Sequence, residues 1–468
     1  MSSAQQRLNA ISPRTAWEPF TPTRRSRWDE LKAAHLLRRA AFGASGPDVA
    51  RAVQAGLEET LDQLFAPGSG SAAFDADADR LEEGAVASGD ARQLEAAWMH
   101  RLLNSPFPLR ERLTLFWHDH FATSQAKVDN LALMRDQVAT LRRDALGNFP
   151  EMLHAMTRDP AMLIWLDSNT NRKGAANENY AREVFELFSL GLGNYSEQDI
   201  REAARALTGW SVRDARAHFD PAQHDDSEKT VFEQRGRFTS GDIVRLCLGR
   251  PACAMFLVRK LFQELVSDAG QPSEELLAPL AEGFRQRDFD IAWLVRRMLG
   301  SWLFYSDAAI QQRVKSPVEL IVGTVKALEG RVGPVQAAAS SAELGQRLYF
   351  PPSVKGWDGG RLWLNSSTLM RRQNLAFEVT RGIGESARCD PARLVREQGL
   401  RTADDMAGFF LRLFHQTADH PQRARIVEQL EVEAAAGPQH PFAQPARTAR
   451  LARAAAHLAL TLPEYQLG

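Results

Sequence analysis

A helix-forming segment at residues 177–191 carries more polar functional groups than a helix needs to stay in water. Asn177 and Asn179 lie at its start, and Glu183 and Glu186 follow on one side of it at about 100° per residue. We predict Glu183 as a metal ligand, Glu186 as a general base, and both asparagines as substrate contacts. The alternative is a solvated acidic helix face with no chemical role.

Two histidines, His118 and His120, flank an aspartate about 60 residues upstream, in the sequence Trp-His-Asp-His-Phe. Residues two apart point in very different directions on a helix, so both bind one ion only if the helix ends near Trp117. We predict both as metal ligands. Two alternatives stay open. In the first, His120 is a buried histidine bonded to a carboxylate, and His118 lies on the surface. In the second, one histidine binds the metal and the other lies outside the ligands and orients them.

A third histidine, His224, lies in a long polar loop at residues 213–241 and is followed by Asp225 and then Lys229. An imidazole beside a carboxylate suits a metal ligand or a general base. We therefore predict His224 as a metal ligand, and Asp225 and Lys229 as catalytic groups. A solvated polar loop is the alternative.

A second loop, at residues 349–365, contains the sequence Pro-Pro-Ser-Val-Lys-Gly-Trp-Asp-Gly-Gly. Glycines allow the backbone to approach a ligand closely. We predict that Lys355, Trp357 and Asp358 line a substrate wall. A structural turn that buries Trp357 is the alternative.

Together these segments supply the ligands of a divalent metal site. Imidazole and carboxylate suit Zn²⁺, Fe²⁺ or Mn²⁺ better than Ca²⁺ or Mg²⁺. A zinc or manganese ion would activate a water molecule for hydrolysis of a polar substrate. Two histidines and one carboxylate around iron would suit oxygen chemistry instead. We predict a metal-dependent enzyme and favour a hydrolase, with a non-haem iron oxidoreductase as the alternative.

The composition indicates an ordinary folded protein rather than a nucleic-acid or membrane protein. The chain has 468 residues, of which 44% are hydrophobic and 25% charged, and its net charge is -1. This charge argues against nucleic-acid binding. No apolar run reaches the roughly 20 residues that a membrane span needs. The three cysteines, Cys247, Cys253 and Cys389, form neither a CxxC pair nor an even disulfide framework.

The first 27 residues carry arginines but no apolar stretch of the kind found in a signal peptide. We expect residues 1–27 to be a flexible or surface-wrapped basic arm. The sequence as it stands predicts a cytoplasmic location, or a periplasmic one if an exported partner carries the chain.

Helical periodicity dominates residues 28–468, and alternating strand patterns are almost absent. We predict a mostly α protein: a single large helical domain with long functional loops and at most one short β-hairpin, at residues 231–238. The stretch Gly68–Asp90 is rich in Gly, Ser, Ala and Asp and indicates a loose connection. Ser196, Ser273 and Ser316 mark the starts of helices, the last followed by Pro317.

Several short motifs occur together along the chain. They are His35-Leu-Leu-Arg-Arg-Ala-Ala-Phe-Gly43, Phe116-Trp-His-Asp-His-Phe121, Thr157-Arg-Asp-Pro-Ala-Met162, Asn177-Glu-Asn-Tyr-Ala-Arg-Glu183, Ala206-Leu-Thr-Gly-Trp210, His224-Asp225, Val314-Lys-Ser-Pro-Val-Glu319, Pro351-Pro-Ser-Val-Lys-Gly-Trp-Asp-Gly-Gly360 and Leu462-Pro-Glu-Tyr-Gln466. In this combination the chain resembles the bacterial DUF1800 family, a domain of unknown function, from about residue 30 to its end.

The resemblance implies a helix-rich bacterial protein that is often encoded beside a DUF1501 protein, which frequently carries a twin-arginine signal. It assigns no catalytic residue. A second hypothesis follows from it: the chain is a non-enzymatic partner or chaperone of a DUF1501-type protein, and its polar motifs form a buried network that maintains the fold.

Overall fold

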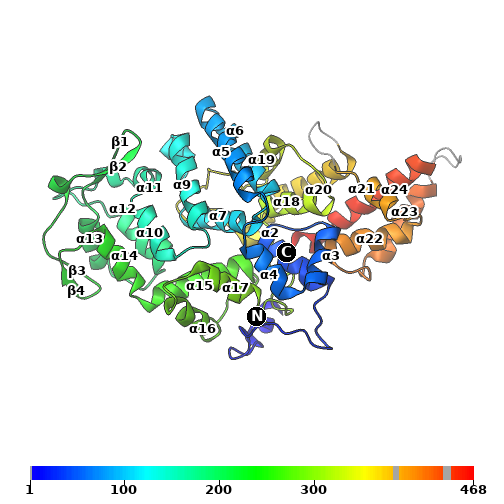
Figure 1. Cartoon of the computed structure of the whole chain (residues 1–468), viewed down its shortest axis with the longest axis horizontal. Helices are drawn as coiled ribbons and strands as arrows, with labels where there is room; N and C mark the ends of the chain where they lie inside the picture. The colour runs from blue at the N-terminus through cyan, green and yellow to red at the C-terminus, as the bar shows by residue number, and fades with distance from the viewer. Residues whose placement is uncertain (1–2, 383–388, 436–443) are drawn as a thin grey trace.

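A computed structural model of the chain describes residues 3–382, 389–435 and 444–468. These residues form 24 α-helices and two small antiparallel sheets of two strands each, so the protein is mostly α, as the sequence predicts. Figure 1 shows an elongated molecule with the strands at one end, α23 and α24 at the other, and both termini near the middle.

The helices in the first half of the chain are α1 (Ser3–Asn9), α2 (Glu30–Ala41), α3 (Gly46–Ala55), α4 (Leu57–Phe65), α5 (Ser71–Ser88), α6 (Ala91–Asn104), α7 (Pro108–His120), α8 (Gln125–Val128), α9 (Leu131–Asp144), α10 (Phe149–Thr157), α11 (Pro160–Trp165), α12 (Asn179–Glu183) and α13 (Glu197–Ala206). A π-helical segment, η2 (Val184–Ser189), continues α12 directly. The strands are β1 (Trp210–Arg213), β2 (Arg216–Phe219), β3 (Lys229–Val231) and β4 (Gln234–Gly236).

The remaining helices are α14 (Ser240–Leu248), α15 (Pro251–Leu265), α16 (Glu274–Arg285), α17 (Ile291–Leu299), α18 (Pro317–Ala327), α19 (Pro334–Glu343), α20 (Ser366–Arg381), α21 (Pro391–Glu397), α22 (Ala403–His415), α23 (Arg423–Ala435) and α24 (Gln444–Leu460). Their starts follow the expected capping. Ser196 and Ser316 form capping boxes with Asp199 and Glu319, and the Ser273 side chain accepts from the N–H of Leu276.

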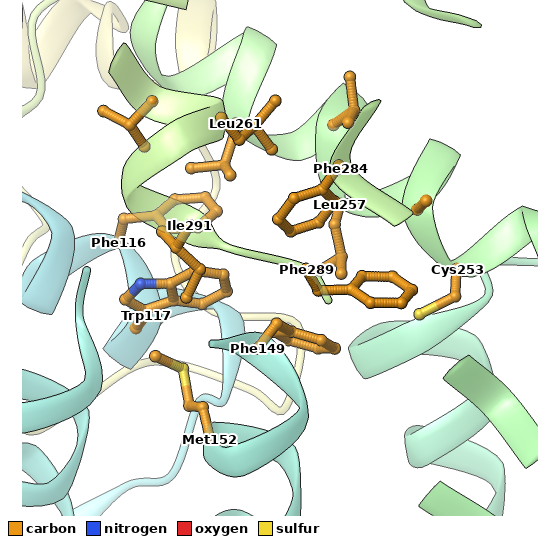
Figure 2. Packing of buried hydrophobic residues seen from close by; sticks show 14 of the residues in the cluster. Phe116, Trp117, Phe149, Met152, Cys253, Leu257, Leu261, Phe284, Phe289 and Ile291 are labelled. Carbon is orange, nitrogen blue, oxygen red and sulfur yellow. The ribbon is translucent and has the colours of Figure 1, made fainter. Parts of the chain in front are cut away.

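Two hydrophobic cores hold these helices together, and α7 contributes to both. Leu113 and Trp117 of α7 belong to the core formed with α10 and α14–α17, whereas Leu115 belongs to the core formed with α6 and α18–α24. Figure 2 shows Trp117 packed with Phe149 of α10 and Ile291 of α17. The indole N–H of Trp117 donates to the Ala145 carbonyl at 3.1 Å, which satisfies the polar atom of this fully buried ring. Side chains on opposite faces of α7 therefore reach different cores.

The predicted hairpin near residues 231–238 is confirmed, since β3 and β4 pair between Lys229 and Gly236. A second hairpin, β1 and β2, was not predicted. Its turn residues, Asp214 and Ala215, both have positive φ, at 48° and 58°. In most sequences this turn type is recognised by Asn-Gly or Asp-Gly at its two central positions. The Asp-Ala pair found here does not predict it.

The prediction of a loose connection at Gly68–Asp90 is wrong, because residues Ser71–Ser88 form α5. Few of its side chains are apolar and buried, so the hydrophobic pattern is weak. Tertiary contacts stabilise it instead: Glu82 of α5 is buried and accepts from Nε of the buried Arg101 of α6 at 2.7 Å.

Residues of the N-terminal segment pack on the first core. Trp17 and Phe20 are buried, and the Trp17 indole donates to the Leu276 carbonyl at 2.6 Å. The backbone N–H of Phe20 donates to Gly300 O at 2.8 Å. Trp17 and Phe20 stand alone among polar residues, so they form no periodic pattern in the sequence.

Within the described parts of the chain, no helix combines the length and the apolar character that crossing a bilayer requires.

Candidate functional site

Helix α7 does not end near Trp117 but continues through His120. The two histidines therefore lie on an unbroken helix, and their side chains reach different cores. The His118 ring lies beside Trp98, Tyr349 and Trp357, with centroid distances of 5.2, 6.0 and 5.6 Å. The His120 ring lies near Phe188 and Phe256 instead.

His118 is fully buried, which excludes the alternative that placed it on the surface. Neither ring nitrogen has a hydrogen-bond partner among the described residues. Burial lowers the pKa of His118 to about 3, so the ring is neutral at physiological pH.

His120 is also buried, and it bonds a backbone carbonyl rather than a carboxylate. Its Nε2–H donates to Phe188 O of η2 at 3.1 Å, which leaves Nδ1 as the unprotonated nitrogen. Nδ1 has no partner among the described residues. Burial, followed by the charge of Lys260, holds the pKa of His120 well below its usual range. The contact joins the end of α7 to the π-helical segment.

Asp119, between the two histidines, points to the 349–365 loop. The backbone N–H of Trp357 donates to its Oδ1 at 2.7 Å. Gly356 lies against the same residue: a Cβ there would come within 2.1 Å of Asp119 Oδ1 and 2.6 Å of Asp119 O. Burial raises the pKa of Asp119 to about 7, although the Trp357 N–H and Lys260 act against this shift.

The charge of Lys260 of α15 acts on both Asp119 and His120, although neither residue makes an ion pair or hydrogen bond with it among the described residues. Its ammonium group makes no hydrogen bond or ion pair within the described ranges, and it lies 5.7 Å from the centroid of the Phe256 ring. Burial lowers the pKa of Lys260, while Asp119 works in the opposite direction. The pKa of the Asp119 carboxyl group is raised and that of the Lys260 ammonium group is lowered. Such opposite shifts in two neighbouring groups are expected where a site carries out acid–base chemistry.

Two more charged groups, Glu183 and Lys355, interact with each other electrostatically, and Lys355 directly precedes Gly356, which packs on Asp119. Glu183 is half-buried at the end of α12, and its pKa is raised by burial and by Glu186, whereas Lys355 acts to lower it. The side chain of Glu183 has no hydrogen-bond or ion-pair partner in the part of the chain that the structure describes. Glu186, one turn on, accepts from the Tyr195 hydroxyl at 2.9 Å. We call Asp119, Glu183, Lys260 and Lys355 the Asp119 cluster.

The π-helical segment η2 lies beside the end of α7. A π segment adds a residue to the helical turn and is frequent at functional sites. In η2 it leaves the carbonyl of Phe188 free for His120. Gly191, just after η2, lies so close to Phe256 of α15 that a Cβ would come within 3.0 Å of that ring.

The predicted residues His224, Asp225 and Lys229 lie at the hairpin end of the molecule and hold the chain there. His224 Nδ1–H donates to the Thr208 carbonyl at 3.0 Å. Asp225 accepts from Arg205 Nε at 2.7 Å, and hydrogen bonds from Arg205 and Ser227 outweigh burial and hold its pKa well below the usual range. The buried Lys229 donates to the carbonyls of Asp225 and Ser227, and burial lowers its pKa.

The predicted substrate contacts divide in a similar way. Asn177 donates to Thr170 Oγ1 at 2.9 Å, and its Oδ1 accepts from the N–H of Asn179 at 2.9 Å, so its polar atoms shape the turn before α12. Trp357 is buried beside His118, and Asp358 is exposed. Lys355, by contrast, is exposed on the loop, and its charge acts on Glu183.

The four predicted metal ligands thus lie in separate places. In the described residues, no group of three or more His, Cys, Asp or Glu side chains is arranged to hold a metal ion. These side chains do not fit a zinc, iron or manganese centre in this conformation. The metal stays a prediction, which elemental analysis of the purified protein tests.

Comparison with known proteins agrees with the motifs seen in the sequence. A family model described as "Protein of unknown function (DUF1800)" matches residues 35–467. The chain belongs to the DUF1800 family. No curated protein and no solved structure matches it. Membership of DUF1800 assigns no reaction, so the function is argued from the Asp119 cluster.

Sequence reasoning missed two members of this cluster. Asp119 lies between the two predicted histidine ligands in the sequence, but the predicted metal site gives it no role. Lys260 occupies an unremarkable position in an amphipathic helix. Only the fold brings it near Asp119, and the sequence held no signal for it.

Proposed function

We propose that the chain is a hydrolase in which Asp119 acts as general base and Lys260 stabilises negative charge. The observation that supports the proposal most strongly is the shift in the pKa values of Asp119 and Lys260. Both groups are pushed toward neutrality by burial, and Lys260 is bound by no partner among the described residues. Structural ion pairs show the opposite pattern, with tight contacts and pKa values that favour the charged forms.

The chemistry follows from these two groups. The Asp119 carboxylate takes a proton from water as the water oxygen bonds to a carbonyl or phosphoryl centre. The Lys260 ammonium group lies where negative charge then develops on the attacked group. The bond to the leaving group breaks as that group takes up the proton that Asp119 accepted from water. Glu183 and Lys355 orient a polar substrate beside the pair.

The substitution Asp119→Asn tests the proposal. The amide still accepts from the Trp357 N–H, so the loop stays in place, but it takes no proton from water. We expect the wild type to hydrolyse at least one of the p-nitrophenyl esters of acetate, butyrate and phosphate. We expect the variant to lose about 10²-fold or more of that rate. The wild-type rate should rise with pH through about 7, as Asp119 ionises.

Stability provides a second readout for the same variant. Because the pKa of Asp119 is raised on folding, the folded state loses stability as the pH rises from the ordinary value of about 3.9 to about 7, and this loss is complete above that. Asp119→Asn should therefore be more stable than the wild type at pH 8 while being inactive. The exposed Asp136, changed to Asn, is the matched control and should alter neither property. Failure to hydrolyse any of these esters, or full activity in Asp119→Asn, would contradict the proposal.

A second candidate function is binding to a DUF1501-type partner, and an exposed apolar strip supports it. Leu369, Met370 and Phe377 of α20 are 38, 67 and 38% exposed, and Leu362 nearby is 65% exposed. Such clustered apolar exposure marks contact surfaces. Co-expression with the neighbouring DUF1501-type protein, with Met370→Asp beside the wild type, tests this. Copurification that is lost in the variant is the expected result, and the absence of copurification would exclude the partner.

A further inference from the structure

A cavity of about 450 Å³ lies where α2, α18 and α22 meet, away from the Asp119 cluster. This volume falls in the range of about 300–1,000 Å³ that small-molecule sites occupy. Three segments far apart in the chain line it: Arg38 and Arg39 of α2, Lys315 just before α18, and Phe414 and Tyr465 near the end of the chain. Each segment carries one of the motifs that the Asp119 cluster does not use.

Arg39 is the most deeply buried cation of this pocket. Its side chain is buried, with 1% of the residue exposed, and Nη2 donates to the Val266 carbonyl at 2.9 Å. Nε and Nη1 have no hydrogen-bond partner in the described residues. A buried guanidinium with unpaired N–H groups is costly unless something accepts from them. Burial accordingly lowers the pKa of Arg39 to about 9.

Two further cations share the pocket. Arg38 donates to Gln416, but its Nε and Nη2 are also without partners among the described residues. Lys315 is 7% exposed and donates to the Tyr465 carbonyl at 2.7 Å. Its Nζ lies 3.6 Å from the centroid of the Tyr465 ring. A carbonyl and a ring face solvate the ammonium group without neutralising its charge.

The nearby carboxylates offset only part of this charge: other arginines hold Glu319, and Asp268 acts on Arg39 from outside the lining without an ion pair to it among the described residues. Glu319, which also lines the pocket, accepts from Arg112 at 2.7 Å and from Arg313. The other carboxylates of the lining are exposed: Glu30, Glu329 and Glu397. In the described residues, no ion pair reaches Arg38, Arg39 or Lys315. The inner wall of the pocket therefore carries three cations, Arg38, Arg39 and Lys315, and one carboxylate side chain, Glu319.

The rest of the lining is largely apolar and includes Phe42, Leu413 and Phe414. We propose that this pocket binds an amphiphilic anion, in which a carboxylate or phosphate group is attached to an apolar chain. The anion accepts from the free N–H groups of Arg38 and Arg39, and the chain lies on Phe42 and Phe414. The site is independent of the Asp119 cluster and does not rest on the proposed hydrolase.

Titration calorimetry on the full chain tests the proposal with four probes: octanoate, octyl phosphate, inorganic phosphate and 1-octanol. We expect one molecule of octanoate or octyl phosphate to bind per chain. Inorganic phosphate, which lacks the chain, and 1-octanol, which lacks the charge, should each bind at least about tenfold more weakly.

Two variants locate the site. Arg38 is only partly buried, so Arg38→Gln should fold and weaken binding of the anionic probes about tenfold or more. Ala50 lies exposed on the lining, and Ala50→Trp narrows the pocket without changing its charge. The absence of saturable binding, or wild-type affinity in both variants, would overturn the proposal. Inorganic phosphate binding as tightly as octyl phosphate would overturn the assignment of an amphiphile.

Discussion

Glu319→Gln should lower the free energy of unfolding by about 3–5 kcal/mol, the typical cost of removing one partner from a buried ionic network. Glu319 is 5% exposed. It pairs with Arg112 at 2.7 Å and with Arg313, and it accepts from the N–H of Ser316 at 2.7 Å. The amide can still accept hydrogen bonds but leaves two buried guanidinium groups with less opposing charge. Urea denaturation of wild type and variant measures the difference.

A surface ion pair provides the control. Glu58 pairs with Arg296 at 3.2 Å, but its side chain is 70% exposed, so water screens the interaction. Glu58→Gln should leave the unfolding midpoint within experimental error. Equal losses in Glu58→Gln and Glu319→Gln would show that the buried network has no special importance for stability.

The same network sets the response to acid. Burial opposes the ionisation of Glu319, but Arg112 and Arg313 outweigh it and hold its pKa well below the usual range. A carboxylate whose pKa is lowered on folding contributes stability above its unfolded pKa of about 4.3, and loses it as the pH falls further. If other carboxylates dominate acid unfolding, Glu319→Gln and the wild type should unfold at nearly the same pH. We expect the wild type to keep its advantage over the variant down to about pH 4 and to lose it below that.

Gly356→Ala is expected to have the second large effect, because two costs add at this position. Gly356 has a φ of +89°, which side-chain-bearing residues rarely adopt, and a Cβ would come within 2.6 Å of Asp119 O. Backbone strain of about 1–3 kcal/mol and overpacking of about 1–3 kcal/mol predict a total loss of about 2–6 kcal/mol. The loop must move away from Asp119 to make room, so hydrolysis should fall as well.

Gly359, three residues on, is the matched control. It has an ordinary φ, and no atom lies within 4 Å of where its Cβ would be. Gly359→Ala should leave both stability and activity unchanged. A Gly356→Ala protein as stable and active as Gly359→Ala would contradict the close packing of this loop on Asp119.

Much of the fold followed from sequence patterns because those patterns are local. The helix starts at Ser196, Ser273 and Ser316 were predictable from capping residues, and the β3–β4 hairpin from a short run of strand-type sequence. Helix α5 was missed because contacts with α6 stabilise it, as between Glu82 and Arg101, rather than an apolar stripe.

The candidate site was only partly predictable. Glu183 was predicted as a metal ligand and Lys355 as a substrate contact, and in the fold the charge of Lys355 does act on Glu183. The prediction that His118 and His120 bind one ion required α7 to end near Trp117. The helix instead continues through His120, so the two side chains point to different cores. The pair of Asp119 and Lys260 depends on the packing of α7 against α15, which joins residues about 140 positions apart, and no local pattern reports that contact.

The most direct test of the proposed acid–base centre is the pKa of Asp119 itself. NMR titration of the ¹³C-labelled aspartate carboxyl groups, with Asp119→Asn to assign the signal, measures it. We expect a titration near pH 7, displaced upward in Lys260→Met, because Lys260 acts to lower the pKa of Asp119. A titration near the ordinary value of about 3.9, unchanged in Lys260→Met, would contradict the account.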